Sequence, residues 1–490
     1  MRARAVFGGL LLAAGCVHRP PAINGVPGAP RQPNEYWTPS AADAARLESA
    51  RAERAAVPAP AMPAAFGRLG VPEIVDLALR NNPATRLSWA QARAAADVFG
   101  ASRGAFLPTV SVDVNTSTAR PLAPSGVLSQ RSQLAPSVGL SYLVLDFGAR
   151  AGNVDVARQT AIAADLSHNV VVQNTILGVE QALFAYQAAR TQRDAQRSAV
   201  EEATASLNAA EERHRVGLAT IADVLQARTA RSQAQLTLES LEGAAHIAQG
   251  TLAVAMGIPA NASFEPPMLT DSLCPDSLRF IALSVDTLIA TATRNRPDLE
   301  AVRAQAAAAA AQVRVARSGL FPTVSLNANR GYTTSNVPGL QGSTYTIGLG
   351  FDLPLFTGMS RQYSLQAASE QLAAANARSE QARQQIALQV FTAYYTLQTS
   401  TDRVRTAADL LASATESESV ARGRYREGVG SIVDLLIAQS ALADARAQDA
   451  QARWQWRGAM AQLAHDVGVL GLRGEALAPL GTADTSGTHR

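Results

Sequence analysis

The sequence predicts a mainly helical chain with a membrane β-barrel segment, built as one structural half that occurs twice. Three observations support this fold class. Matching motifs recur 214 and 211 residues apart. In each half a proline precedes short segments in which apolar and polar residues alternate, as they do in β-strands. Long alanine-rich stretches without proline follow, so each half is expected to contain a helix, a β-hairpin, a very long helix and a returning helix.

The composition excludes several classes of protein. The 490 residues include 43 Lys and Arg against 40 Asp and Glu, a formal net charge of +3. This near-balanced total supplies no basic field for phosphates, so we expect no nucleic-acid partner. Two cysteines exclude a disulfide scaffold and a cysteine-rich metal protein. If Cys16 belongs to an N-terminal anchor, Cys274 has no partner within the chain and is interpreted as a small apolar residue.

The first residues have the pattern of an export signal. Two arginines precede an apolar run over residues 5–14, which is too short to span a bilayer as a helix. The run leads into the letters LAAGC, which resemble the lipobox of bacterial lipoproteins. This resemblance implies a signal peptide over residues 1–15, a lipid on Cys16 and, because Val17 follows, delivery to the outer membrane. An ordinary signal peptide with an incidental cysteine is the alternative.

Composition and repeated motifs divide the rest of the chain. Residues 16–67 are rich in proline, alanine and glycine and are interpreted as an extended tether. The first repeat is expected over residues 68–265, the second over residues 266–470, and a C-terminal tail over residues 471–490. The repeats share FLPTVSVDVN with LFPTVSLNAN, and ERHRVGLATIADVLQA with RGRYREGVGSIVDLLIA. A period of this length is unlike that of a solenoid.

Four strands are predicted from the alternating segments. They cover about residues 107–118 and 135–146 in the first repeat, and about residues 322–333 and 343–355 in the second. Val, Leu, Ile and Tyr occupy one face of these strands, whereas Ser, Asn, Asp, Thr and Gly occupy the other. Each pair of strands is expected to form a hairpin whose tip is a loop rich in Pro, Ser and Gly.

Very long helices are predicted after the hairpins. Residues 151–216 would reach about 100 Å as one continuous helix. Gly217 and Gly428 are expected to end the long helices, because glycine adopts the positive φ of a helix terminus. Returning helices then cover about residues 221–256 and 432–466. In the second repeat a narrow apolar seam typical of coiled-coil packing comprises Ile386, Val390, Leu397, Val404 and Leu411.

Four strands cannot close a barrel alone. Strands of about 10 residues suit a tilted bilayer crossing, although a soluble sandwich would show the same alternation. The export signal favours the membrane, where an open sheet edge leaves backbone groups unpaired at a cost of several kcal/mol each. Bacterial barrels start at about 8 strands, so the chain is expected to oligomerise. Two copies would give 8 strands and a filled lumen, and three would give 12 strands and a water-filled bore.

The motifs together resemble the bacterial outer-membrane efflux duct family, whose members are TolC-like. The resemblance rests on FLPTVS and LFPTVS, on LDFG in the first repeat, and on VGLATIADVLQA paired with GVGSIVDLLIAQ. The order of hairpin, very long helix and returning helix also occurs twice. It covers about residues 68–468. It implies a homotrimer in which a 12-stranded barrel in the outer membrane continues as a 12-helix coiled-coil tube through the periplasm. A periplasmic adaptor and an inner-membrane pump, of the resistance-nodulation-division type given the lipid anchor, are the implied partners.

The same resemblance implies a gate at the periplasmic end of the tube. Asp434 is the gate candidate, Tyr425 is a latch between neighbouring coils, and Asp223 is the corresponding acid of the first repeat. Threefold symmetry would bring such carboxylates into a ring that favours cations. An ordinary acid near a helix start, which complements the helix dipole, is the alternative. Ile437 stands where family members often have a second acid, so the constriction is expected to be partly hydrophobic.

The two helix-reversal turns match the segments that contact the adaptor in the family. Small residues there would let another helical hairpin dock closely, whereas a plain reversal turn without a partner is the alternative. These segments comprise Val216, Gly217, Leu218, Ala219 and Thr220 in the first repeat, and Gly428, Val429, Gly430 and Ser431 in the second.

Catalysis and metal binding are not expected. The six histidines are scattered without metal-ligand spacing, and no nucleophile-elbow, P-loop or zinc-protease motif occurs in the sequence. The sequence therefore predicts a passive gated duct for small molecules, such as drugs or other toxic compounds, with no cofactor. An exit duct for type I protein secretion is one alternative. A lipid-anchored periplasmic coiled-coil scaffold is the alternative from another class, and the cargo itself is left open.

Overall fold

The computed structural model describes four long segments of the chain. They cover residues 70–120, 130–264, 284–337 and 339–470, and residues 44–46, 48, 49, 266 and 269 are also described. The chain divides into two compact units, Met1–Met62 and Pro63–Arg490, and the account below concerns the second. Within the first unit, residues 44–46, 48 and 49 are helical, and they lie in the range 16–67 that is interpreted as a tether. Cys16, Cys274, the signal peptide and the C-terminal tail lie outside the described residues.

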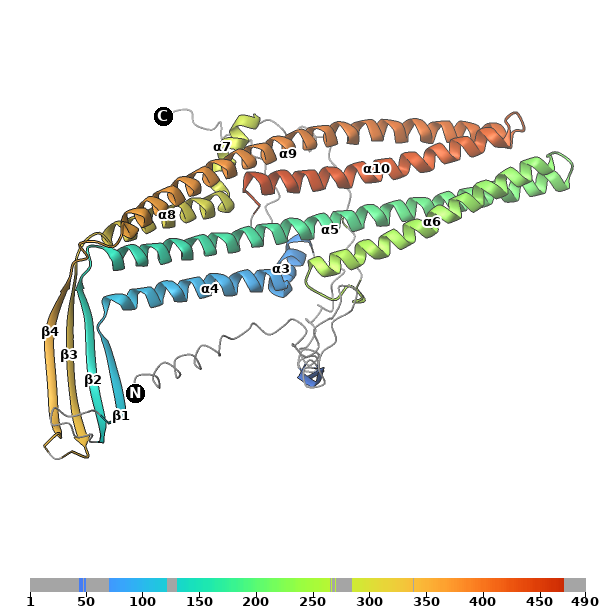
Figure 1. Cartoon of the computed structure of the whole chain (residues 1–490). Helices are drawn as coiled ribbons and strands as arrows, with labels where there is room; N and C mark the ends of the chain where they lie inside the picture. Colours follow the sequence, from blue (N-terminus) through green and yellow to red (C-terminus); the bar gives the residue numbers. More distant parts are fainter. Residues whose placement is uncertain are drawn as a thin grey trace, which may run out of the picture. The chain divides into compact units, whose positions relative to one another are not determined.

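The two repeats have the same order of elements (Figure 1). The first contains α3 (Val71–Asn81), α4 (Pro83–Arg103), β1 (Thr109–Ala119), β2 (Arg131–Leu145), α5 (Ala149–Arg215) and α6 (Ile221–Ala255). The second contains α7 (Val285–Asn295), α8 (Pro297–Ser318), β3 (Thr323–Ser335), β4 (Gly342–Asp352), α9 (Ser360–Arg426) and α10 (Ile432–Val467). The short helices α3 and α7 were not predicted. No helix among the described residues has both the length and the apolar composition needed to cross a bilayer.

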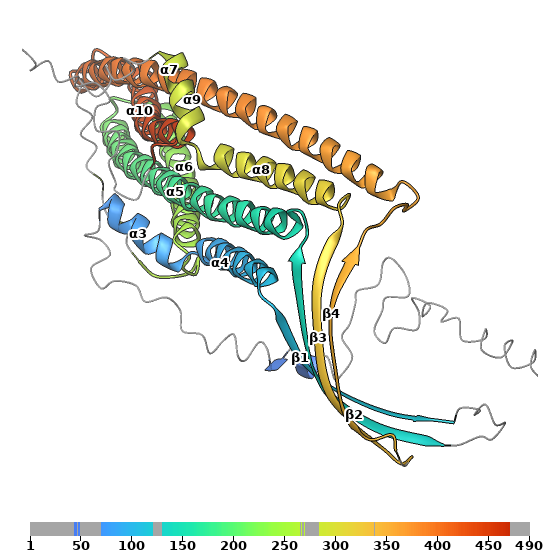
Figure 2. The same cartoon turned by 90° about the vertical axis from the view of Figure 1, so that its left-hand side faces the viewer.

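The four strands form one antiparallel sheet in the order β1-β2-β3-β4. Figure 2 shows them side by side, curving away from the helices. The central pair, β2 with β3, joins the two repeats. The alternation of apolar and polar residues expected along residues 135–146 is interrupted near the end of β2, because the pairing with β3 shifts between Leu143 and Leu145. Val144 is therefore an extra residue in a bulge and does not continue the alternation.

The sheet has one polar face and one apolar face. Cross-strand partners on the polar face include Ser111 with Gly139, Asp113 with Ser137, and Asn329 with Thr346. The apolar face pairs Val112 with Val138, Leu326 with Leu349, and Val324 with Phe351. The described residues leave the apolar face uncovered, since Val112 and Leu349 are 73% and 74% exposed. An apolar sheet face of this extent needs a partner that is not water.

A compact corner connects β2 to α5. The Asp146 carboxylate accepts hydrogen bonds from the backbone N–H groups of Gly148 and Arg150, at 3.3 and 2.7 Å. The Arg150 guanidinium returns to the same carboxylate at 3.0 Å and lies 5.3 Å from the centre of the Phe106 ring. Gly148 has a φ of 96°, which glycine adopts without steric cost. The LDFG motif therefore turns the chain from the sheet into the long helix.

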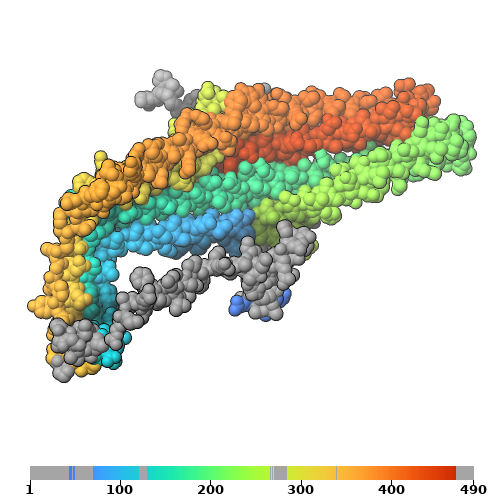
Figure 3. Space-filling model, viewed as in Figure 1, coloured from blue at the N-terminus to red at the C-terminus, as the bar shows by residue number. Residues whose placement is uncertain are grey.

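The helices pack side by side along their length (Figure 3). Helix α10 lies against both α9 and α5, so the two repeats are joined through it. The predicted seam of α9 is the packing face, because Ile386, Val390, Leu397 and Val404 are buried in the core around Trp456. The Trp456 indole N–H donates to the Thr401 hydroxyl at 3.0 Å, which satisfies the buried polar group.

The two repeats have equivalent joints where the returning helices end. The Asn82 side-chain amide donates to the backbone carbonyl of Ala255 at 3.1 Å, and the Arg296 guanidinium donates to that of Asp466 at 3.3 Å. Asn82 and Arg296 each precede the proline of the repeated motif. Gly257 and Gly468 follow the returning helices with φ values of 73° and 79°. Different side chains therefore close the same joint in the two repeats.

Candidate functional site: the helix-hairpin tips

The two helix-reversal turns form the candidate site. We call residues 216–220 the first tip and residues 427–431 the second tip. Both lie at the ends of the long helices that are far from the sheet (Figure 1). All the residues predicted to contact an adaptor lie in these two turns or next to them, and the three gate candidates lie within a few residues of them.

The first tip has the hydrogen-bond pattern of a helix ending on a glycine. The Gly217 N–H donates to the His214 carbonyl at 3.0 Å, and the Leu218 N–H donates to the Arg213 carbonyl at 2.8 Å. Gly217 has a φ of 79°, as expected from the sequence. A ring nitrogen of His214 also lies 2.9 Å from the Ala219 carbonyl oxygen, which ties the helix end to the turn.

The second tip repeats this geometry. The Gly428 N–H donates to the Tyr425 carbonyl at 3.2 Å, and Gly428 has a φ of 76°. The Val429 and Gly430 N–H groups both donate to the Arg424 carbonyl at 3.0 Å. A Cβ atom on Gly430 would lie 3.1 Å from the Tyr425 nitrogen, so only glycine fits here without displacing backbone.

Both aspartate gate candidates close capping boxes. The Asp223 carboxylate accepts from the Thr220 N–H at 2.8 Å, and the Asp223 N–H donates to the Thr220 hydroxyl at 3.2 Å. Asp434 and Ser431 form the same pair, at 3.4 and 3.1 Å. Each aspartate therefore starts its returning helix, a structural role that the sequence analysis held as the alternative to gating. Asp434 is exposed, so its charge is accessible to solvent.

Tyr425 lies between the two helix hairpins. Its side chain is buried, and the Arg213 guanidinium lies 4.4 Å from the ring centre. Arg213 also donates to the Arg426 carbonyl at 3.0 Å. Burial raises the pKa of the Tyr425 phenol, and the nearby Arg213 cation acts in the opposite direction. The two repeats of one chain are thus in contact through a cation on an aromatic ring, a pairing that the sequence analysis did not predict.

Polar contacts continue between the two hairpins above the tips. The Arg446 guanidinium donates to the Glu202 carboxylate at 3.1 Å, and the Ser206 hydroxyl donates to the Gln439 side chain at 3.1 Å. Both contacts join α5 to α10. Because their partners come from different repeats, these contacts could not be assigned from spacing along the chain.

Each returning helix exposes an apolar stripe that begins at its tip. Leu218, Ile221 and Leu225 form the first stripe, with Leu218 78% exposed. Val429, Val433 and Ile437 form the second, with Ile437 63% exposed. A spacing of four residues places Ile221 with Leu225, and Val433 with Ile437, on one face of their helices, whereas Leu218 and Val429 lie in the turns just before. Exposed apolar residues in such a row form a candidate contact surface, and Ile437 belongs to it.

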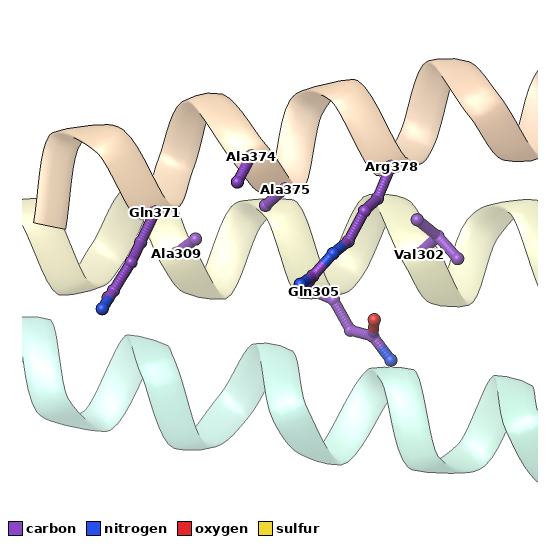
Figure 4. Close-up of a pocket in the computed structure, with 7 residues that line it drawn as sticks. All are labelled: Val302, Gln305, Ala309, Gln371, Ala374, Ala375 and Arg378. Carbon is purple, nitrogen blue, oxygen red and sulfur yellow. The ribbon is translucent and has the colours of Figure 1, made fainter.

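Two hollows lie elsewhere on the described part of the chain. A groove of about 280 Å³ between α8 and α9 is lined by alanines together with Val302, Gln305, Gln371 and Arg378 (Figure 4). A second hollow of about 270 Å³ lies on the polar face of the sheet near Asp113. Neither lining contains a nucleophile with a histidine beside it. Within the described segments, no group of three His, Cys, Asp or Glu side chains is placed to hold a metal ion.

Known proteins match most of this chain. The sequence model of the family described as "Outer membrane efflux protein" matches residues 74–258 and 288–469, one segment in each repeat. Protein CyaE of Bordetella pertussis is 31% identical over 385 residues, which cover 77% of this chain and 79% of that protein. The probable efflux pump outer membrane protein TtgC of Pseudomonas putida is 24% identical over 382 residues, covering 76% and 78% of the two chains.

Solved structures share the fold. The outer membrane protein VceC of Vibrio cholerae aligns with a TM-score of 0.72 at 19% identity, covering 81% of this chain and 96% of that one. The CusC structure, which is described in terms of transmembrane channel formation, aligns with a TM-score of 0.73 at 19% identity over 84% and 96% of the two chains. The duplicated architecture, the tip geometry and the sequence match agree, and the chain belongs to the outer membrane efflux protein family of channel proteins.

Proposed function

We propose that three copies of this chain form a passive, gated exit duct in the outer membrane. The observation that supports it most directly is the open four-stranded sheet, whose edge strands β1 and β4 have no partner on their outer sides within the described residues. Neither edge can stay unpaired in hydrocarbon. Pairing β1 of one copy with β4 of the next satisfies both, and three copies give a 12-stranded barrel with a water-filled bore.

Two belts of exposed side chains support a bilayer crossing. The inner belt lies where strands meet helices and comprises Phe106, Leu107, Phe147, Phe321, Leu355 and Phe356. The outer belt comprises Tyr332 and Tyr345. Eleven residues separate Phe321 from Tyr332, and Phe356 from Tyr345. At about 3.4 Å per residue and a tilt of about 40°, the belts are roughly 28 Å apart, close to the apolar band of about 25 Å on outer-membrane barrels.

The polar face of the sheet would then line the bore, and the helices would continue it as a coiled-coil tube through the periplasm. The tube's tips would meet a periplasmic adaptor through the two apolar stripes, and the adaptor would join an inner-membrane pump of the resistance-nodulation-division type. A lipid on Cys16 would anchor each copy to the outer membrane. Energy for export would come from the pump, because the hollows in the described part of the duct offer no catalytic chemistry.

Small molecules are the proposed cargo. The names of two similar proteins support this choice: TtgC is described as a probable efflux pump protein, and OpmQ of Pseudomonas aeruginosa as a pyoverdine export protein. OpmQ is 28% identical over 311 residues, covering 60% of this chain and 62% of that protein. Isolating the chain together with its inner-membrane partner would decide between efflux and type I secretion, because the two systems use different pumps.

The duct itself has a direct test. The purified mature protein is expected to run as a heat-resistant trimer in detergent, and to conduct ions in planar bilayers, because only a closed barrel satisfies all strand edges. A variant that keeps the signal peptide but lacks strand β1, with residues 109–119 deleted, is the negative control. A wild-type protein that remains monomeric in water without detergent contradicts the duct and supports a periplasmic scaffold.

The gating role of Asp434 can be separated from its capping role. Asp434→Asn keeps an oxygen for the Ser431 N–H but removes the charge, whereas Asp434→Ala removes both. We expect both variants to lower the preference for cations in single-channel recordings, because a carboxylate ring is lost. Only the alanine variant is expected to lose about 1 kcal/mol of stability in thermal melts.

Asp409→Asn, which makes the same charge change on the exposed surface of α9, serves as the control. An unchanged ion preference in Asp434→Asn would assign this side chain to helix capping alone.

A further inference from the structure

One charged side chain interrupts the apolar face of the sheet. Among the outward positions of the four described strands, Arg330 is the only Asp, Glu, Lys or Arg. The other residues on the apolar face of these strands are aliphatic, aromatic or hydroxyl-bearing, and they include Ala328 of β3 and Pro136 of β2. The acids of the sheet, Asp113 and Asp352, lie on the opposite face, since they pair with Ser137 and Thr323. No carboxylate on its own face is therefore available to Arg330.

The neighbours of Arg330 are tyrosine and valine. Its cross-strand partner on β4 is Tyr345, and its partner on β2 is Val138. Directly opposed residues have Cβ atoms about 5 Å apart, so the Arg330 and Tyr345 side chains leave the sheet next to each other. Tyr332 lies two residues further along β3 on the same face. Tyr345 is 81% and Tyr332 51% exposed.

Arg330 lies on a strand that neighbouring copies cannot cover. Strand β3 is paired on both sides within the chain, to β2 and to β4. Closure of the barrel uses only β1 and β4, so the outward side chains of β3 face lipid in the proposed trimer. Arg330 is also level with the outer belt, because Tyr345 is a member of that belt and pairs with it.

The depth of Arg330 decides which lipid group it meets. A lipid-facing arginine costs about 2–4 kcal/mol at the bilayer midplane but about 0–1 kcal/mol near the interface. At the outer belt the long side chain reaches the headgroups, where tyrosines also prefer to lie. The strand ends far from the helices face the outer leaflet if the helices lie in the periplasm. The outer leaflet of a bacterial outer membrane consists of phosphorylated glycolipid.

We propose that Arg330, framed by Tyr332 and Tyr345, binds a phosphate group of the outer-leaflet glycolipid. Guanidinium groups bind phosphate through two parallel N–H···O hydrogen bonds, a geometry that lysine does not provide. The tyrosine hydroxyls supply further donors at the headgroup level. This inference rests on the proposed function, because it needs a barrel that crosses the bilayer, and it assigns three equivalent lipid sites to the trimer.

Lipid titration of the purified trimer tests the site. Native mass spectrometry in detergent would follow binding of diphosphorylated lipid A, with dephosphorylated lipid A as the matched ligand lacking the phosphates. The wild type is expected to bind up to three molecules of the phosphorylated lipid, and Arg330→Gln to bind them about fivefold more weakly. Arg330→Lys should fall between the two, because it keeps the charge but loses the paired hydrogen bonds.

Controls separate the possible results. Arg378→Gln makes the same charge change on α9, about 27 Å along the helix from its start, and should bind lipid like the wild type. Equal binding of the dephosphorylated lipid, or unchanged binding in Arg330→Gln, overturns the site while a conducting trimer leaves the duct intact. If inorganic phosphate at equal concentration displaces the lipid, Arg330 binds free phosphate and the lipid site is overturned. Failure of the wild type to form trimers overturns the duct itself.

Discussion

Arg296→Ala is expected to destabilise the protein by about 3–5 kcal/mol, because the buried Asp466 carboxylate, 3.9 Å away, loses its cation and Asp298 loses its hydrogen bonds. The Arg296 side chain is 8% exposed and holds Asp298 through two hydrogen bonds, at 3.0 and 2.6 Å. It also donates to Gln389 at 2.6 Å and to the Asp466 carbonyl at 3.3 Å. One guanidinium therefore joins the start of α8 to α9 and α10.

The measurement is the melting temperature of the purified protein in detergent, followed by circular dichroism at 222 nm. For a chain of about 400 ordered residues, 3–5 kcal/mol corresponds to a decrease of roughly 4–6 °C. Arg314→Ala is the matched control, because Arg314 pairs with Asp155 at 2.6 Å with both side chains about half exposed. Exposed pairs contribute about 0–1 kcal/mol. Equal melting of the two variants would contradict the role assigned to Arg296.

Gly257→Ala is the second substitution that we expect to lower the stability of the protein strongly. A Cβ atom on Gly257 would lie 2.7 Å from the backbone atoms of Asn81 and Asn82, and the φ of 73° is itself unfavourable for alanine. Backbone cannot move aside as a flexible side chain can. Overpacking of about 1–3 kcal/mol and a left-handed backbone cost of about 1–2 kcal/mol act together, so the melting temperature should fall by several degrees.

Two other glycines provide comparison variants for the predicted loss of stability in Gly257→Ala. A Cβ on Gly468, in the equivalent joint, would approach Arg296 and Asn295 to 3.2 Å at a φ of 79°, so Gly468→Ala should cost less. Gly178 lies inside α5 with nothing within 4 Å of its Cβ position. Gly178→Ala should raise stability by about 0.5–1 kcal/mol, because alanine favours the helix. A melting temperature of Gly257→Ala at or above that of Gly178→Ala would contradict the close approach at this joint.

Much of the fold follows from periodicity along the chain. The predicted strand at about residues 107–118 is β1 (Thr109–Ala119), and the predicted helix over residues 151–216 is α5 (Ala149–Arg215). Gly217 and Gly428 have the positive φ that the sequence predicts. Such features are local, since side-chain alternation, helix period and the freedom of glycine act within a few residues. The bulge at Val144 was missed because only its partner strand β3 defines it.

For the candidate site as well, the sequence predicted some features and only the structure showed the others. The sequence identified the tips and their aspartates, but it could not distinguish a gate charge from a helix cap, because both use an acid at the same position. Capping became visible only through distances such as the 2.8 Å between the Thr220 nitrogen and the Asp223 carboxylate. The gating role and the adaptor contact are still predictions.

By itself the sequence determined the duplication, the elements and the positions at which the chain turns, because repeated local patterns specify repeated local structure. Only the tertiary structure decided which residues far apart in the chain meet. Arg213 reaches Tyr425, Arg446 reaches Glu202, and Asn82 and Arg296 hold equivalent joints with unlike side chains. Such contacts join residues more than 150 positions apart, and packing of helices against one another, rather than any period along the chain, brings them together.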